Sequence, residues 1–308
     1  RNFLGRGQLL NLNAKISERE ANYTAGFSEP FFLNRDVYAS FNLFDNKIDY
    51  KESSYELKRE GFSFNSSYSL SEYFQQSVGY NLEERDVNPG SGASASIVAE
   101  EGKTVISQIS TSLTYNTLDN NQNPTEGMRI AGGSSLAGLG GDKKLLKFYN
   151  SGNLYKSYND KLLILDFGYT AGVITGLDED VLISDRYFLG GNNFRGFKQS
   201  GLGPRDKNSG DSLGGNIYYT GSVKASFGIG LPPELGLKGN LFTTIGTLTG
   251  IDKSSVSYHD DSSLRMSGGV GISWSSPFGP ISVILSQAIL KESYDQTEAV
   301  SFGIGTKF

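Results

Sequence analysis

The feature that most constrains this chain is an alternation of apolar and polar side chains with a period of two, which is the period of a β-strand. Between residues 264 and 274, one face carries Leu264, Met266, Val270, Ile272 and Trp274. The opposite face carries Arg265 and small residues such as Ser267. The same split recurs over residues 217–229 and again at the end of the chain. Each such segment therefore separates two different environments.

Fourteen segments of this kind follow one another along the chain. They lie near residues 8–18, 20–29, 36–46, 53–68, 73–86, 105–116, 126–137, 144–156, 161–174, 214–229, 236–247, 264–274, 281–291 and 298–308. Strands of globular proteins average about 5 to 6 residues, whereas a tilted strand needs roughly 9 to 11 residues to cross a bilayer. These segments are therefore long enough to cross a bilayer.

The connections between the segments are unequal in a regular way. The three long ones, near 87–104, 175–213 and 248–263, are the fifth, ninth and eleventh, so antiparallel pairing places all three on one side. Membrane barrels combine short periplasmic turns with long extracellular loops. A soluble sandwich or propeller is the alternative, but no repeat of about 40 residues is visible. We therefore predict an all-β fold, a transmembrane antiparallel β-barrel.

Composition excludes several classes of site. The chain has no cysteine and a single histidine, His259, so a disulfide framework, a thiolate site and a histidine-rich zinc cage are excluded. The formal net charge is −5 and the basic residues are scattered, so nucleic acid is not an expected partner. We expect no cofactor, no metal site and no enzymatic activity.

A short motif in the longest connection carries a family resemblance. Phe194-Arg195-Gly196-Phe197 follows Asp185-Arg186-Tyr187-Phe188-Leu189-Gly190-Gly191. Further matching segments are Glu29-Pro30-Phe31-Phe32-Leu33, Thr117-Leu118-Asp119-Asn120, Asn123-Pro124-Thr125-Glu126-Gly127, Gly214-Gly215-Asn216, Ser276-Pro277-Phe278-Gly279-Pro280 and the terminal Phe308. In this order and spacing, over the whole chain, they resemble the BamA-like outer-membrane protein assembly factors of the bacterial surface antigen (outer-membrane insertase) superfamily.

The resemblance implies a domain organisation. Residues 1–308 would form the outer-membrane β-barrel domain of a Gram-negative bacterium, with the fourteen segments matching strands three to sixteen of a sixteen-stranded barrel. The periplasmic POTRA domains and the first two strands would then be absent from this piece. In the family, the loop with the Arg-Gly-Phe motif folds back into the lumen.

The sequence departs from the family pattern around Arg195. Two acids face the motif arginine in familiar members, and the matching positions here are Lys224 and Thr244, neither of which can pair with a guanidinium. We expect Arg195 to find another acid, with the inward-facing Asp166 as candidate, or to use backbone carbonyls. A solvated loop arginine is the remaining alternative.

The composition of the loop itself predicts that it docks. Residues 185–213 contain Tyr187, Phe188, Phe194 and Phe197, and leaving such rings in water would forgo about 1.5 to 3 kcal/mol each. Glycines at 190, 191, 196, 201 and 203 allow tight turns. We expect the loop to cross the rim and pack inside the barrel.

The resemblance implies a factor that inserts other β-barrels into the outer membrane, by templating strand pairing at a seam between the first and last strands. Gly303, Gly305 and Phe308 are the seam candidates, because glycine weakens strand pairing. Close packing in a narrow lumen is an equal explanation of the two glycines. The implied partners are outer-membrane lipid, lipopolysaccharide, nascent β-barrel substrates and periplasmic or lipoprotein assembly partners. The alternative function is a polypeptide-translocating or passive pore.

Overall fold

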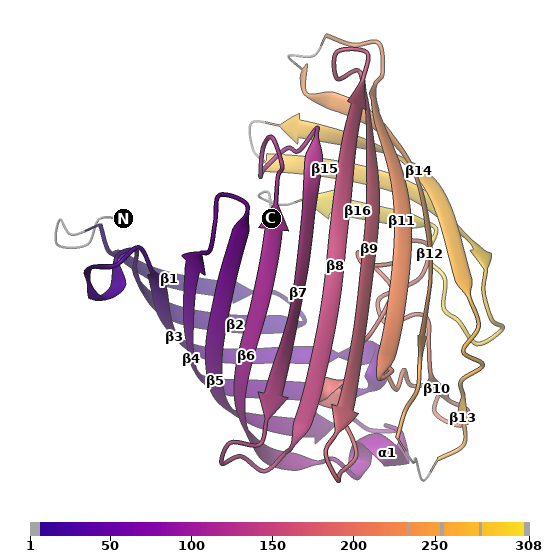
Figure 1. Ribbon diagram of the computed structural model, residues 1–308. Coiled ribbons are helices and arrows are strands. Elements are labelled where there is room, and N and C mark those ends of the chain that lie inside the picture. The colour runs from indigo at the N-terminus through magenta and orange to yellow at the C-terminus, as the bar shows by residue number, and fades with distance from the viewer. Residues whose placement is uncertain (1–6, 233–234, 253–255, 277–278, 305–308) are drawn as a thin grey trace.

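A single antiparallel sheet of fourteen strands forms the protein (Figure 1). The computed structural model describes residues 7–232, 235–252, 256–276 and 279–304. The strands are β1 (Leu9–Ile16), β2 (Glu20–Glu29), β3 (Tyr38–Tyr50), β4 (Tyr55–Ser69), β5 (Phe74–Pro89), β6 (Gly102–Asn116), β7 (Gly127–Ala137), β8 (Leu145–Tyr158), β9 (Leu163–Gly176), β11 (Ile217–Gly228), β12 (Leu237–Thr249), β14 (Arg265–Ser276), β15 (Gly279–Leu290) and β16 (Val300–Ile304). The predicted count and order of strands are confirmed.

The sheet curls around a central space, as Figure 1 shows. Each strand pairs with its neighbours in chain order, and the two-residue strand β10 (Arg205–Asp206) pairs with β13 (Tyr258–His259) outside the main sheet. Strands β1 and β16 end the order, and they are not paired with each other within the described residues. The sequence did not predict β10 and β13, since two residues carry no periodicity.

Among the described residues, the helical elements that are resolved as such are single turns. These are η1 (Phe32–Asn34), η2 (Lys51–Ser53), α1 (Ala95–Val98) and η3 (Ile183–Asp185). The side chain of Ser94 caps α1 by accepting a hydrogen bond from the Ser96 amide. Among the described residues, no helix is both long enough and apolar enough to cross a membrane.

The long connections lie together at one end of the barrel. In Figure 1 this is the lower end, where α1, β10 and β13 are labelled. The connections after β5, β9 and β12 all reach this end, as the antiparallel order requires. By the rule that outer loops are long and periplasmic turns short, it is the extracellular end.

The two faces of the sheet differ as the alternation predicts. Val270, Ile272 and Trp274 of β14 are exposed on the outer face, whereas Ser267 and Arg265 are buried on the inner face. Outward apolar side chains continue around the other strands, including Phe167, Tyr219 and Val223. An outer surface this apolar is suited to lipid.

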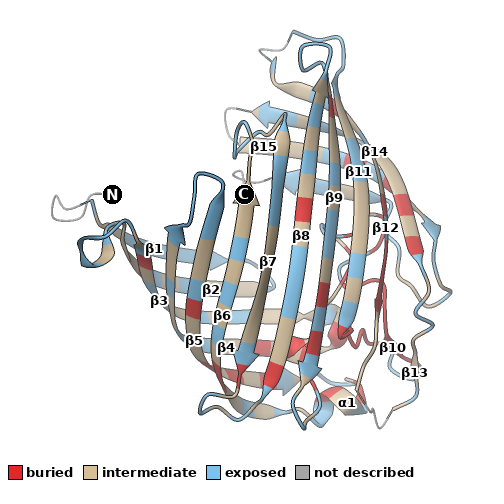
Figure 2. Ribbon diagram, in the orientation of Figure 1, coloured by how far each residue is buried: buried red, intermediate tan, exposed pale blue. Residues whose placement is uncertain are grey.

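The core lies inside the extracellular half of the barrel rather than between two layers. Figure 2 shows the buried residues gathered toward that end. Three clusters join inner-face strand residues to the long loop, for example Tyr55 and Leu57 with Ile183 and Leu213. The loops thus supply the core that a single sheet lacks.

The lumen loop and the last strand as candidate functional site

The connection between β9 and β11, residues 177–216, fills the extracellular half of the lumen. Phe194 and Phe197 are 0% exposed, and their rings meet edge to face with centroids 5.3 Å apart. They pack with Leu189, Leu202 and Leu248, the last on the inner face of β12. The expected docking of the loop is therefore confirmed.

Two glycines allow the loop to approach its neighbours. Gly190 has a φ of 130°, and a β-carbon there would lie 1.9 Å from the carbonyl oxygen of Lys198. Gly196 has a φ of 92°, and its β-carbon would lie 2.9 Å from that of Ser267 on β14. Because an L side chain is disfavoured at both angles and meets neighbouring atoms at both, glycine is required.

Arg195 lies between these glycines and reaches an aromatic ring. Its guanidinium carbon is 5.9 Å from the ring centroid of Phe242 on β12, a cation–π distance. Burial alone lowers the pKa of Arg195, and no charged neighbour offsets it. Within the described ranges, no ion pair joins Arg195 to a carboxylate.

The expected pairing of Arg195 with Asp166 is therefore wrong. Asp166 lies 3.2 Å from the ammonium of Lys224, and the Asn153 amide donates to it at 2.9 Å. Asp166 and Lys224 are register partners on the adjacent strands β9 and β11, so the lysine reaches the carboxylate first. Lys224 thus neutralises the acid that Arg195 was expected to use.

A buried ionic network fastens the start of the loop to the wall. The Arg85 guanidinium of β5 donates to Asp185 at 2.7 Å, and the Lys147 ammonium of β8 donates to the same oxygen at 3.0 Å. Glu83 bridges Arg85 and Arg59. Breaking such a pair from one side leaves a buried charge unpaired, which costs about 3 to 5 kcal/mol. The sequence analysis did not find this network, because its bonded partners lie up to 100 residues apart.

The motif also bonds to the segment that leads into the last strand. The Glu298 amide donates to the Gly196 carbonyl at 3.1 Å, and the Lys198 amide donates to the Gln296 carbonyl at 2.9 Å. The Gln296 amide donates back to Gly201 at 2.8 Å. These backbone bonds couple the loop to β16, which begins at Val300.

A buried arginine holds the other part of this segment. Arg265, 1% exposed at the start of β14, donates to Asp295 at 3.1 Å and to the Tyr294 hydroxyl at 3.0 Å. The connection between β15 and β16 is therefore fixed both to the wall and to the loop.

The last strand is only partly described. Gly303 pairs with Ser282 of β15, and a β-carbon on Gly303 would lie 2.7 Å from the Ser282 hydroxyl. This contact supports close packing as one role of Gly303. Gly305 and Phe308 lie outside the described residues.

The lumen contains a cavity of about 870 Å³ beside the loop. Its lining includes Arg195, Asp166, Lys224, Asn240 and Phe242, so it is mixed in polarity. Asn240 donates to Ser273 and accepts from Ser226, which continues a polar band across three strands. The arrangement offers hydrogen-bonding groups along the cavity wall.

The whole chain matches one family model. Residues 2–308 match the Omp85 superfamily domain. The chain belongs to the Omp85 superfamily. This relationship covers the loop motif and the last strand together, so both features are parts of one Omp85 domain.

Two curated proteins show which members of the superfamily this chain is similar to. It is 32% identical over 310 residues to the outer membrane protein assembly factor BamA of Neorickettsia risticii, covering 100% of this chain and 42% of that protein. It is 28% identical over 252 residues to the sorting and assembly machinery component 50 homolog of Bos taurus, covering 79% of this chain and 52% of that protein. The chain thus spans about half or less of the length of these relatives.

A solved structure agrees on the fold. BamA from Haemophilus ducreyi lacking POTRA domains 1–3 superposes with a TM-score of 0.88 at 21% identity, over 100% of this chain and 66% of that one. With the superfamily match, this makes the Omp85 chain a transmembrane β-barrel of the outer membrane.

Proposed function

We propose that this Omp85 barrel inserts other β-barrel proteins into the outer membrane, without a chemical reaction of its own. The observation that carries the proposal is the 32% identity, over the full chain, to a protein named as an outer membrane protein assembly factor. The likeness to a component of a sorting and assembly machinery supports the same role.

The physical task is to lower the barrier for a strand to enter lipid. An unpaired strand in hydrocarbon leaves each amide and carbonyl unsatisfied at several kcal/mol, so a sheet edge that offers hydrogen bonds acts as a template. Strand β16 ends the sheet order, and no strand pairs with its second edge within the described residues. We propose this edge as the template.

The register tells which β16 residues face that edge. The Ser286 amide of β15 donates to the Ala299 carbonyl, so residues 299, 301 and 303 direct their backbone groups toward β15. Val300 and Phe302 then direct theirs toward the free edge. The Phe302 side chain is 65% exposed on the outer face.

The coupling of the Arg-Gly-Phe loop to residues 296–298 gives the loop a role in this proposal. By holding the segment before β16, the loop fixes where the template edge begins. Nascent β-barrel proteins are the proposed substrates, with outer-membrane lipid and lipopolysaccharide as surroundings and periplasmic or lipoprotein factors as partners. The assignment of residues 1–308 to one barrel domain, with two strands and POTRA domains missing from this piece, stays a prediction.

A polypeptide-translocating or passive pore is the alternative. A wide, steady passive channel conflicts with the fully buried Phe194 and Phe197, which occupy the extracellular half of the lumen. Large single-channel conductance from the purified protein in planar bilayers, unchanged by Arg195→Ala, would favour the pore.

The test compares two substitutions at one residue. Liposomes containing the protein, Phe302→Pro or Phe302→Ala receive a urea-denatured β-barrel substrate, and its folding is followed by its shift in electrophoretic mobility. Phe302→Pro removes the backbone N–H donor at the free edge. We therefore expect substrate folding to slow by about tenfold, which corresponds to an increase of roughly 1.4 kcal/mol in the activation free energy. Phe302→Ala keeps the amide and should match the wild type. Equal rates for all three proteins and for empty liposomes would contradict the proposal.

A further inference from the structure

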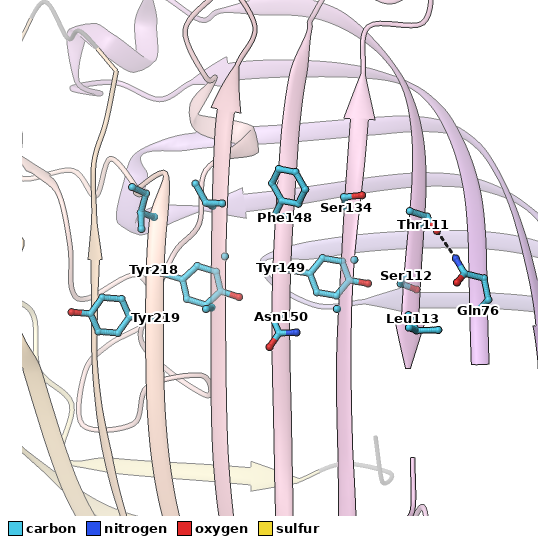
Figure 3. Close-up of a pocket in the computed structure, with 16 residues that line it drawn as sticks. Gln76, Thr111, Ser112, Leu113, Ser134, Phe148, Tyr149, Asn150, Tyr218 and Tyr219 are labelled. Carbon is cyan, nitrogen blue, oxygen red and sulfur yellow. Dashed lines mark hydrogen bonds between the residues drawn. The ribbon is translucent and has the colours of Figure 1, made fainter. Parts of the chain in front are cut away.

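A groove crosses the lipid-facing wall of the barrel, on the side away from the lumen loop. It is an open depression with a volume of about 780 Å³ that extends over six strands, from β5 to β11 (Figure 3). Two in-register rows of outward-facing side chains define it. The first row is Gln76, Leu113, Gly132, Asn150, Ala171 and Tyr219. The second row is Thr111, Ser134, Phe148, Val173 and Ile217.

Small residues form the floor of this groove and large apolar ones its walls. Gly132, Ser134 and Ala171 bring the surface close to the backbone. Phe148 and Tyr219 stand beside them, 48% and 50% exposed. The row Met128, Leu154, Phe167 and Val223, called the flat row below, lies nearer the periplasmic ends of the same wall. It has no small residue and does not line the groove.

Three polar side chains of the groove, Gln76, Thr111 and Asn150, form hydrogen bonds within the barrel wall. Gln76 donates to the Thr111 hydroxyl at 2.6 Å, the bond drawn in Figure 3. Asn150 accepts from the Tyr169 hydroxyl at 2.6 Å and donates to the Ala131 carbonyl at 3.3 Å. None of the residues that line the groove is charged. The groove thus presents a largely apolar surface. It offers no charged side chain that could bind a lipid headgroup or an acidic or basic peptide.

The groove runs from one rim of the barrel toward the other. Gln76 lies two residues after the start of β5, at the end with short turns. Tyr219 lies two residues after the start of β11, at the end with long loops. Five strand spacings of about 4.8 Å make the row roughly 24 Å long. The row is perpendicular to strands that tilt by about 35 to 45°, so it rises through roughly 14 to 17 Å of the ~25 Å apolar band of an outer-membrane barrel.

We propose that this groove is a binding site for an acyl chain of a membrane lipid. The barrel lies in the outer membrane, so hydrocarbon covers this face. In hydrocarbon there is no hydrophobic drive for binding, and selection comes from van der Waals contact. A chain in the groove touches the floor and both walls, whereas a chain on the flat row touches protein on one side. The side-chain amides of Gln76 and Asn150 already form hydrogen bonds within the barrel wall. This favours a lipid acyl chain, which needs no hydrogen bonds, over a protein partner.

Quenching by a brominated lipid tests the site. Trp274, the only tryptophan, is first replaced by phenylalanine, and one reporter is introduced, either Phe148→Trp in the groove wall or Phe167→Trp on the flat row. The full chain, folded in detergent micelles, is titrated with phosphatidylethanolamine that carries bromine on its acyl chain. We expect the Phe148→Trp reporter to reach half-quenching at a lipid mole fraction several-fold lower than the Phe167→Trp reporter.

A filled groove provides the control. Adding Ser134→Phe to the Phe148→Trp protein should fill the groove. The quenching curve of this protein should then coincide with that of the Phe167→Trp reporter on the flat row. Ala225→Phe, the same kind of enlargement on the outer face outside the groove, should leave the curve unchanged. Identical curves for the two reporters in the unfilled protein would overturn the proposal, and so would an equal effect of Ser134→Phe and Ala225→Phe. The comparison of the Phe148→Trp and Phe167→Trp reporters needs no enlarged residue. It therefore tests the proposal even if Ser134→Phe fails to fold.

Discussion

Arg195 places its guanidinium carbon 5.9 Å from the ring centroid of Phe242, and not against a carboxylate. The two residues come from different parts of the fold, the lumen loop and the inner face of β12. Loop docking in this Omp85 barrel therefore includes a cation–π contact in place of an ion pair to the motif arginine.

A double-mutant cycle measures this contact. Arg195→Ala and Phe242→Leu should each lower the free energy of unfolding, with a coupling energy of about 0.5 to 2 kcal/mol between them in urea titrations of the vesicle-bound protein. Arg195→Ala combined with Asp166→Asn should instead be additive within about 0.5 kcal/mol, because Asp166 pairs with Lys224. Strong coupling in the second cycle would restore Asp166 as the partner of Arg195.

Loop docking depends on the missing side chain at Gly190. Gly190→Ala puts a β-carbon 1.9 Å from the Lys198 carbonyl, so the loop should undock and trypsin should cleave it after Lys198. Gly210→Ala is the matched control: Gly210 also has a positive φ, 77°, but nothing lies within 4 Å of a β-carbon there. If trypsin cleaves the loop equally fast in both variants, then backbone strain, and not the clash with Lys198, controls docking.

The assignment of the two faces is tested on β14. Val270→Arg places a charge on the lipid face, where it should cost about 2 to 4 kcal/mol and strongly reduce folding into liposomes. Ser273→Arg points into the lumen cavity and should cost much less. If both variants fold with the same yield, the faces are assigned wrongly.

Glu100 makes loop docking dependent on pH. Burial raises the pKa of Glu100 from 4.5 to about 7, while its carboxylate accepts a hydrogen bond from the Ile183 amide at 2.7 Å. A raised acid pKa means that the docked state binds more protons than the unfolded chain. The contribution of Glu100 to stability is therefore fully present below about pH 4.5 and is lost as the pH rises through about 7.

We expect proteolysis of the loop to be faster at pH 8 than at pH 6 in the wild type, at protease levels matched for activity. Glu100→Gln keeps an acceptor for the Ile183 amide but cannot ionise, so its proteolysis should be the same at both pH values. A pH dependence that persists in Glu100→Gln would assign the effect to another group.

The sequence by itself determined the strands, their order and their two faces. Side-chain alternation along a strand such as Ile217–Gly228 is a local property, because it follows from the pleat and needs no knowledge of the neighbouring strand. The aromatic and glycine content of residues 185–213 likewise predicted that the loop docks, since its rings need burial wherever they find it.

Only the tertiary structure decided which residues meet. Asp166 pairs with Lys224 because the register sets them side by side, while Arg195 reaches Phe242 from a loop whose path depends on its packing against β12 and β14. Arg85 and Asp185 are 100 residues apart, and the groove rows exist only once five strand registers are fixed. Such contacts depend on strand stagger and loop path, and a shift of one residue would change every partner while leaving the alternation within each strand intact.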